Sequence, residues 1–141
     1  MIDLADFRAR WEPYMLSVLR IVVGLLFMEH GLSKMFNFPP QANHTPYMVM
    51  SWVPGLAGIL ETVGGLLIVL GLFTRPVAFI LSGEMAIAYF WSHAPRSFYP
   101  LLNAGDAAVL YCFIFLYFAV AGAGAWSLDR LWEDEPRHAL R

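Results

Sequence analysis

Long apolar stretches alternate along this chain with short polar connections. They cover residues 14–35, 54–73, 77–93 and 103–128. A helix needs about 20 mostly apolar residues to cross the hydrocarbon core of a bilayer, which is about 30 Å thick. The pattern therefore predicts an all-α fold, an integral membrane antiparallel bundle of four transmembrane helices.

The connections between these stretches differ in length. Thr74, Arg75 and Pro76 form so tight a turn that the second and third helices are expected to be antiparallel neighbours. The long connection at 36–53 contains Pro39, Pro40, Asn43, His44 and Pro46. It ends in an amphipathic segment, Tyr47 to Trp52, that we expect to lie at the membrane interface.

Positive charges set the expected orientation, because cytoplasmic flanks of membrane helices are enriched in Lys and Arg. One side of the bundle carries Arg8, Arg10, Arg75, Arg130, Arg137 and Arg141, and the other carries Arg96 and, at a helix end, Lys34. Both termini are therefore expected in the cytoplasm. We expect a cytoplasmic segment at 1–13, which lacks a cleavage signature and is retained, the transmembrane domain at 14–128 and a cytoplasmic tail at 129–141.

Composition agrees with this class of protein. Hydrophobic residues make up 59% of the 141 and charged residues 14%, well below the roughly 25% charged residues of soluble domains. The net charge of -2 gives no basic footprint for nucleic acid. The single cysteine, Cys112, excludes an internal disulfide, and its expected role is packing within a helix.

Ionisable residues inside the predicted spans are the candidate functional groups, because a charge facing lipid at the centre of a span costs at least about 2.5–3.5 kcal/mol. The up-and-down threading places most of them in the outer half of the bundle, namely Glu29, His30, Lys34, Glu61, Glu84 near the midplane, His93 and Asp106. Arg20 alone lies toward the cytoplasmic half. We therefore expect a polar cavity in the outer half.

The first helix has a predicted inner face. At about 100° per residue, one stripe is formed by Arg20, Gly24, Phe27, Gly31 and Lys34, with His30 on its flank. Glu29 lies on the opposite side and is expected to meet the proline-rich loop, another subunit or the outer interface. The aromatic residues of the last helix, such as Tyr111, are interpreted as packing or lipid-facing groups, and His44 and His138 as solvated side chains.

Three interpretations of the charged groups stay open. One is a set of ion pairs, such as Arg20 with Glu84 or Lys34 with Glu61, that fix helix register. Another is an outward-opening cavity that hydrogen-bonds a polar head group such as a quinone, with histidine and carboxylates able to relay protons. The third is a metal site, but no HxxxH or ExxH pair lies within one helix, so no metal ligands are assigned.

Residues from about Leu19 to Asp129 resemble the bacterial DoxX family. The resemblance rests on Arg20 with HGLSKMF at 30–36, ETVGGLLIVLGLFTRPVA at 61–78, EMAIAYFWSHAP at 84–95 and YPLLNAGDAAVLYCFIFLYFAVAGAGAWSLD at 99–129. Where the family pattern opens the last helix with Asn-Gly-Gly-Glu, this chain has Asn103, Ala104, Gly105 and Asp106. Aspartate keeps the charge of glutamate but has a shorter reach.

The resemblance implies a four-helix protein of the bacterial plasma membrane. Some relatives are subunits of membrane oxidoreductases, including thiosulfate:quinone oxidoreductase, and others are linked to quinone or oxidative-stress responses. The candidate substrate-binding residues are Arg20, His30, Lys34, Glu61, Glu84, His93, Asn103 and Asp106. Arg20, His30 and Lys34 would orient the head group, while Glu61, Glu84 and Asp106 would accept or relay protons.

Two classes of function follow. In the first, the protein binds a quinone or a similar small amphiphile and works with a partner subunit of a quinone-linked oxidoreductase, since the chain has no flavin, haem or iron–sulfur motif of its own. No covalently bound cofactor is expected. In the second, it is a non-enzymatic module, a small-solute transporter or an assembly subunit, although no internal repeat is visible. Small-residue helix faces are compatible with a homo-oligomer in either case.

Overall fold

The computed structural model describes residues 3–40 and 52–133, and every regular element in this part of the chain is a helix. The elements are α1 (Leu4–Phe36), α2 (Trp52–Ile59), η1 (Leu60–Gly64), α3 (Gly65–Leu70), α4 (Thr74–Ala88), η2 (Tyr89–His93), α5 (Pro100–Asn103), α6 (Asp106–Ala121) and α7 (Leu128–Glu133). The predicted all-α class is confirmed for these residues. His44, His138 and the predicted interfacial segment, except Trp52 at the start of α2, lie outside the described ranges.

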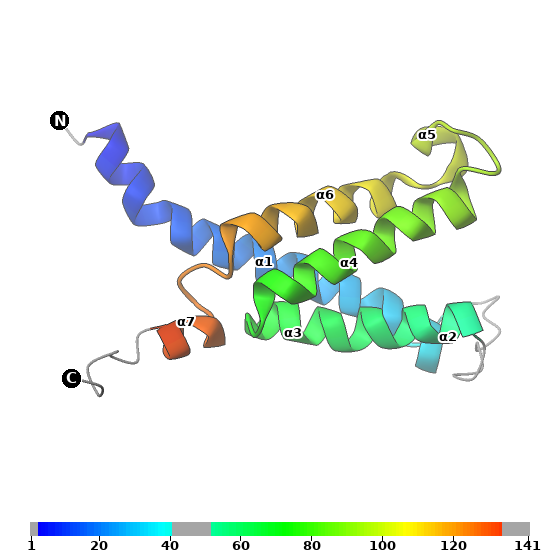
Figure 1. The fold of residues 1–141 in the computed structure, drawn as a ribbon, viewed down its shortest axis with the longest axis horizontal. Helices are drawn as coiled ribbons and strands as arrows, with labels where there is room; N and C mark the ends of the chain where they lie inside the picture. The colour runs from blue at the N-terminus through cyan, green and yellow to red at the C-terminus, as the bar shows by residue number, and fades with distance from the viewer. Residues whose placement is uncertain (1–2, 41–51, 134–141) are drawn as a thin grey trace.

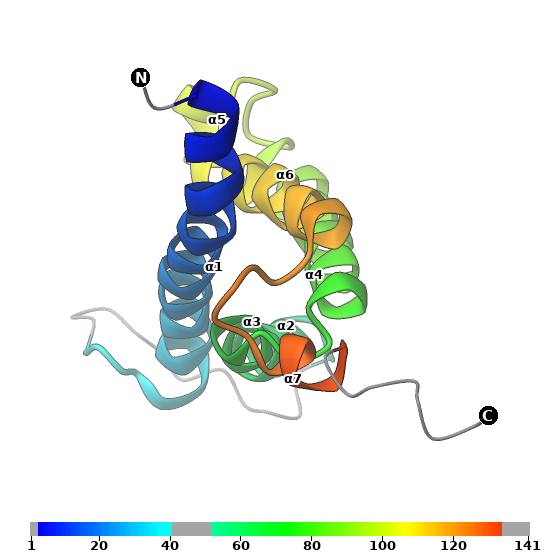
Figure 2. The same cartoon turned by 90° about the vertical axis from the view of Figure 1, so that its left-hand side faces the viewer.

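The long helices lie side by side and alternate in direction (Figure 1). α1 runs from one end of the molecule to the other, the α2–η1–α3 run returns, α4–η2 runs back, and α6 returns again. α1 packs along α2, η1 and α3, and α4 packs along α6. Seen end-on in Figure 2, these helices surround a common interior. The start of α1, the α3–α4 turn and α7 therefore share one end of the molecule.

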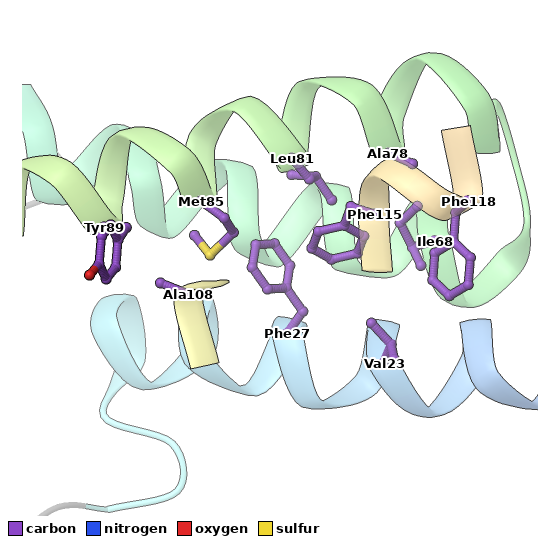
Figure 3. Packing of buried hydrophobic residues seen from close by; sticks show 10 residues of the cluster. All are labelled: Val23, Phe27, Ile68, Ala78, Leu81, Met85, Tyr89, Ala108, Phe115 and Phe118. Atoms are coloured by element: carbon purple, nitrogen blue, oxygen red, sulfur yellow. The ribbon is translucent and has the colours of Figure 1, made fainter. Parts of the chain in front are cut away.

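Aromatic and aliphatic side chains from these helices fill the interior. Phe27 on α1 meets Phe115 on α6 edge to face, with ring centroids 4.8 Å apart. Figure 3 shows Ile68 from α3 and Leu81 and Met85 from α4 in the same cluster. This apolar core holds the helices at fixed positions, so polar side chains on their inner faces are brought together at defined depths.

The predicted inner stripe of α1 is confirmed. Its members Arg20, Gly24, Phe27 and Gly31 are buried and Lys34 is half-buried, whereas Glu29 on the other side is exposed. Gly31 allows α1 to touch η1 closely, because a Cβ atom at Gly31 would lie 2.5 Å from the backbone nitrogen of Thr62.

α1 begins earlier than the sequence predicted. It starts at Leu4, where the Asp3 carboxylate accepts a hydrogen bond from the Ala5 amide at 3.0 Å, rather than after Pro13. Pro13 lies inside the helix. A proline removes one amide donor from a helix. The carbonyl oxygen of Pro13 accepts two hydrogen bonds besides any within the helix ladder, from Ser17 Oγ at 2.9 Å and from the Ala125 amide at 3.0 Å.

The tight turn also lies earlier than predicted. Gly71 ends α3 in the left-handed region with φ 64°, and Thr74 already belongs to α4. The first amides of α4 are capped from far along the chain, because the Asp129 carboxylate accepts from the Phe73 amide at 2.6 Å and from the Thr74 amide at 2.8 Å. A carboxylate at a helix N-terminus satisfies free amides and interacts favourably with the helix dipole.

The last apolar helix is shorter than predicted. α6 ends at Ala121 rather than near Leu128, because Gly122 and Gly124 adopt positive φ angles of 91° and 81° that break the helix. Residues 122–127 then form an irregular segment, here called the C-terminal strap, that crosses the end of the bundle. The Trp126 amide of the strap donates to Ser17 Oγ at 3.0 Å.

The surface of the bundle is strongly apolar, while its interior contains polar groups. Phe79 and Ile87 on α4 and Leu110 and Phe113 on α6 are among many large apolar side chains that are exposed. The buried polar residues are Ser17, Arg20, Ser33, Glu61, Thr74, Ser82 and Asn103. Among the described helices, α1 is the one that is both long and apolar enough to cross a bilayer, and shorter apolar runs cover Gly55–Leu70 and Asp106–Ala121.

Candidate functional site

Lys34 and Glu61 form an ion pair between α1 and η1. Lys34 Nζ lies 2.5 Å from Glu61 Oε1, and the side chains are 34% and 4% exposed. Gly31, one turn before Lys34, brings the two helices close enough for this contact. The predicted pairing of these two residues is confirmed.

Glu84 on α4 faces the same region. Glu61 and Lys34 are both close enough to act on Glu84 electrostatically. Both Glu84 carboxylate oxygens and Glu61 Oε2 are buried, and the described residues provide no hydrogen-bond partner for any of the three. We call Lys34, Glu61 and Glu84 the acidic cluster. It joins three helical segments that are distant in the sequence.

The acidic cluster is built on a local distortion of its helix. Glu61 belongs to η1, a stretch of π-helix inside an otherwise α-helical run. Such stretches insert one extra residue into a turn and occur frequently at functional sites. A second π-helical stretch, η2, contains His93. Neither distortion was visible in the apolar pattern, because that pattern does not distinguish an α-helical from a π-helical turn.

His30 and Tyr111 lie at the border of the acidic cluster. The exposed His30 contacts its own helix through Nδ1, 2.8 Å from the Leu26 carbonyl oxygen, and its ring is 5.8 Å from that of Tyr111 on α6. The Tyr111 ring also packs on Phe27 at 5.1 Å, so its interpretation as a packing group is confirmed.

Tyr111 is nevertheless a polar neighbour of the acidic cluster, although it is not among the site residues predicted from the sequence. Glu29 and Glu61 are both close enough to act on its phenol group electrostatically. The signal was present in the spacing, because Tyr111, Phe115 and Phe118 follow the three- and four-residue intervals of one helix face and the latter two are buried.

Arg20 lies apart from the acidic cluster, and its predicted pairing with Glu84 is wrong. The side chain is fully buried and donates only to backbone carbonyl oxygens. Nε donates to Ala123 at 2.7 Å, Nη1 to Val69 at 2.6 Å and to Ile68, and Nη2 to Trp126. Arg20 therefore joins α3 to the C-terminal strap. The apolar pattern could not reveal these hydrogen bonds of Arg20, because the pattern depends on side chains and does not show where the backbone carbonyl groups of an irregular segment lie.

His93, Asn103 and Asp106 occupy the connection between α4 and α6. Asn103 is buried, its Nδ2 donates to the Ser97 carbonyl at 2.6 Å, and its Oδ1 accepts from the Gly105 amide at 2.7 Å. His93 Nδ1 lies 3.0 Å from the Asn103 carbonyl oxygen, and Asp106 is exposed in the first turn of α6. The contacts of His93 and Asn103 hold the connection in shape. The structure therefore assigns these two residues and Asp106 to the α4–α6 connection and not to the acidic cluster.

No three side chains of His, Cys, Asp or Glu within 3–40 and 52–133 converge in a way that could hold a metal ion. A shallow apolar depression of about 320 Å³ is lined by Ala86, Ile87, Phe90 and Trp91 on the outside of α4 and η2. None of the sequence-predicted site residues lines it.

Comparison with known proteins places the chain in a family. A family model described as DoxX matches residues 15–94. An uncharacterized protein of Haemophilus influenzae is 46% identical over 123 residues, which cover 85% of this chain and 92% of that protein. Inner membrane protein YphA of Escherichia coli is 32% identical, covering 89% of this chain and 94% of its own length. Inner membrane protein YqjF of the same organism is 31% identical, with coverages of 81% and 88%.

The match to the family model spans most of α1 and all of α2 through η2. This chain belongs to the DoxX family, and the resemblance seen in the sequence is confirmed. No solved structure matches it.

Proposed function

We propose that this chain is a multi-pass protein of the bacterial inner membrane. Four helical runs would cross the membrane, namely α1, α2–η1–α3, α4–η2 and α6. The relatives YphA and YqjF are both called inner membrane proteins. The apolar surface of α4 and α6 suits lipid contact. α1 has 33 residues, roughly 50 Å at about 1.5 Å per residue, so its first turns would extend beyond a bilayer core of about 30 Å.

The proposed orientation has both termini in the cytoplasm. Arg8 and Arg10 near the start of α1, Arg75 at the start of α4 and Arg130 in α7 belong to elements at one end of the bundle, whereas Arg96 follows η2 at the other end. The excess of arginine at one end supports a cytoplasmic location for that end. The acidic cluster then lies in the outer half of the membrane.

The proposed activity is binding of the head group of a quinone, or a similar small amphiphile, at the acidic cluster. The observation that carries this proposal is the set of three buried carboxylate oxygens on Glu61 and Glu84 that have no partner in the part of the chain described. Buried polar groups are nearly always hydrogen-bonded. A ligand head group would supply the missing partners, and the half-exposed Lys34 would lie on its entry path.

In this proposal the protein works within a quinone-linked oxidoreductase system, together with a partner subunit. The quinone would supply the redox chemistry. This chain would bind and orient the head group through Lys34 and Glu84, hold it against the His30 and Tyr111 rings, and exclude water with the Phe27 and Phe115 core.

Native mass spectrometry with lipid extraction tests this proposal on protein purified from its own membranes. A quinone is expected to co-purify in stoichiometric amount and to be lost in Lys34→Met and Glu61→Gln. Glu29→Gln is the matched control, because Glu29 is a carboxylate on α1 that faces outward, and it is expected to retain the quinone. Wild-type protein that carries no quinone and takes up none on addition would refute quinone binding.

A second function has one observation in its favour. The Lys34–Glu61 contact already neutralises the ammonium charge and satisfies one carboxylate oxygen, as a purely structural ion pair would. In that case the chain is a non-enzymatic membrane module, a small-solute transporter or an assembly subunit, and solute flux in liposomes or a co-purifying complex would identify it.

A further inference from the structure

The acidic cluster contains one more acid than base. Lys34 contacts Glu61 directly, which leaves Glu84 as a second carboxyl group without a cation of its own in the described ranges 3–40 and 52–133. Within these ranges, the charged groups that act on Glu84 are Glu61 from η1 and Lys34 from α1. α6, which packs along α4, brings the ionisable side chains Tyr111 and Cys112, and both of these are uncharged at neutral pH.

An ionised Glu84 would be expensive at this position. Both of its oxygens are buried, and no donor among the described side chains or amides reaches either of them. Burying an ionised carboxylate without hydrogen bonds costs far more than burying a neutral polar group. The negative Glu61 would add repulsion, and the attraction of Lys34 is already directed to Glu61.

We propose that Glu84 is retained as an uncharged carboxylic acid and that the acidic cluster therefore selects uncharged head groups that accept a hydrogen bond. This inference rests on the proposed function and deepens it by naming the charge class of the ligand. With Lys34 positive, Glu61 negative and Glu84 neutral, the cluster has no net charge. An anionic ligand would place a second negative charge beside Glu61.

The three groups then offer different contacts to a ligand. A protonated carboxyl group gives one O–H donor and keeps an acceptor oxygen, so Glu84 can donate to a carbonyl oxygen. Lys34 adds N–H donors, and Glu61 Oε2, free in the part of the chain described, accepts from a hydroxyl group. A quinone presents the carbonyl oxygens and its reduced form the hydroxyl groups, whereas a carboxylate or an ammonium ligand matches only part of the site.

Infrared spectroscopy tests the protonation state without any ligand. The carbonyl stretch of an undissociated carboxylic acid is separate from the carboxylate bands and shifts in D2O. We expect this band in wild-type protein reconstituted in lipid at neutral pH, its loss in Glu84→Gln and its retention in the control Glu29→Gln, whose carboxylate is exposed. A wild-type spectrum without the band, or a band that persists in Glu84→Gln, would overturn the inference.

Binding measurements test the selectivity. Decylubiquinone and decanoate both carry a long saturated alkyl tail, but the first has an uncharged head group and the second an anionic one, so decylubiquinone is expected to bind more tightly. Glu84→Gln keeps a donor and should bind within a few-fold of wild type, whereas Glu84→Met has no donor and should bind about tenfold more weakly, which is the value of one hydrogen bond. Tighter binding of decanoate, or equal losses in the two variants, would contradict the inference.

Failure of the proposed function would look different. If neither probe binds but the acid band belongs to Glu84, the quinone proposal fails while the neutral state of Glu84 stands. If decylubiquinone binds but no acid band is present, quinone binding stands and the neutral Glu84 does not.

Discussion

Two cations on the inner stripe of α1 are stabilised by different partners. Lys34 presents a compact ammonium group to one carboxylate oxygen of Glu61. Arg20 spreads its guanidinium across carbonyl oxygens of α3 and the C-terminal strap. The planar guanidinium group has five N–H donors in fixed directions, which an ammonium group cannot reproduce. Arg20 therefore has a structural role at this end of the bundle that a lysine would not fill.

Replacement of Arg20 tests this role. Arg20→Met leaves buried carbonyl oxygens without a donor, and each unsatisfied group costs about 1–3 kcal/mol, so the variant should lose at least about 2 kcal/mol of stability. Arg20→Lys should fall between Arg20→Met and wild type. The measurement is thermal unfolding in lipid nanodiscs, with Arg8→Met as the control because Arg8 is exposed on the same helix. Equal melting of Arg20→Met and wild type would exclude the carbonyl contacts as a source of stability.

The Lys34–Glu61 pair makes a separate prediction. Removing one partner of a fully buried pair costs about 3–5 kcal/mol, because the other charge remains buried. Each single substitution here should cost less than that, because Lys34 is 34% exposed. Lys34→Met with Glu61→Gln should therefore be less destabilising than the sum of the two single substitutions, with a coupling energy of about 1–3 kcal/mol. A double-mutant cycle from unfolding in detergent measures this. Additive effects of the two substitutions would show that the contact contributes no coupling.

Part of the site could be predicted from residue type and depth. The sequence offers Lys34 with Glu61 as one possible ion pair, because both are expected at a similar depth on neighbouring helices, and the structure confirms the contact. It also offers Arg20 with Glu84, and this pair is wrong, because Arg20 donates to carbonyl oxygens of an irregular segment instead. The hydrophobic pattern carries no information about such a segment, since it fixes which face of a helix is buried but not which backbone oxygens lie opposite.

At the scale of elements, the apolar pattern predicts which helices exist and in which direction each runs better than it predicts where each helix begins and ends. The inner stripe of α1 was right because a helical period follows directly from residue spacing. The end of α6 was wrong because apolar residues continue past Gly122, where the backbone turns into positive φ. The apolar composition continues past Gly122, but the helical conformation of the backbone ends there.

Close packing between α1 and η1 depends on Gly31. A Cβ atom there would lie 2.4 Å from Thr62 Oγ1 and 2.5 Å from the Thr62 amide nitrogen. Gly31→Ala should therefore push the helices apart and destabilise the protein by about 1–3 kcal/mol. It should also weaken ligand retention, because Lys34 and Glu61 would separate.

Gly83 provides the matched control on α4. A Cβ atom at Gly83 would meet nothing within 4 Å. Gly83→Ala is expected to raise stability by up to about 1 kcal/mol through helix propensity alone. The measurement is the thermal unfolding temperature of the two variants under the same conditions. A Gly31→Ala variant as stable as Gly83→Ala would contradict the close approach of α1 and η1.

At the scale of the whole molecule, the two ends of the bundle differ in chemistry. One end is closed by the C-terminal strap, which contacts α1 through Ser17 and Arg20, and by Asp129, which caps α4. The acidic cluster lies away from that end. In the proposed orientation, with both termini in the cytoplasm, this asymmetry would favour entry of the proposed ligand from the outer side of the membrane.

The proposed topology makes a prediction that reporter fusions can check. Green fluorescent protein fused to the C-terminus should fluoresce, and alkaline phosphatase fused there should be inactive, because both termini are expected in the cytoplasm. A fusion at Arg96, which follows η2, should give the reverse result. Active phosphatase at the C-terminus would contradict the proposed orientation.

Photoaffinity labelling with an azidoquinone, in membranes and with peptides identified by mass spectrometry, tests whether a quinone binds at the acidic cluster. We expect label on the peptides that carry Lys34, Glu61 and Tyr111. The label should be removed by excess unlabelled quinone and should be absent in Glu61→Gln. Label confined to the apolar depression at Phe90 and Trp91, or label that unlabelled quinone does not compete away, would contradict a quinone site at the acidic cluster.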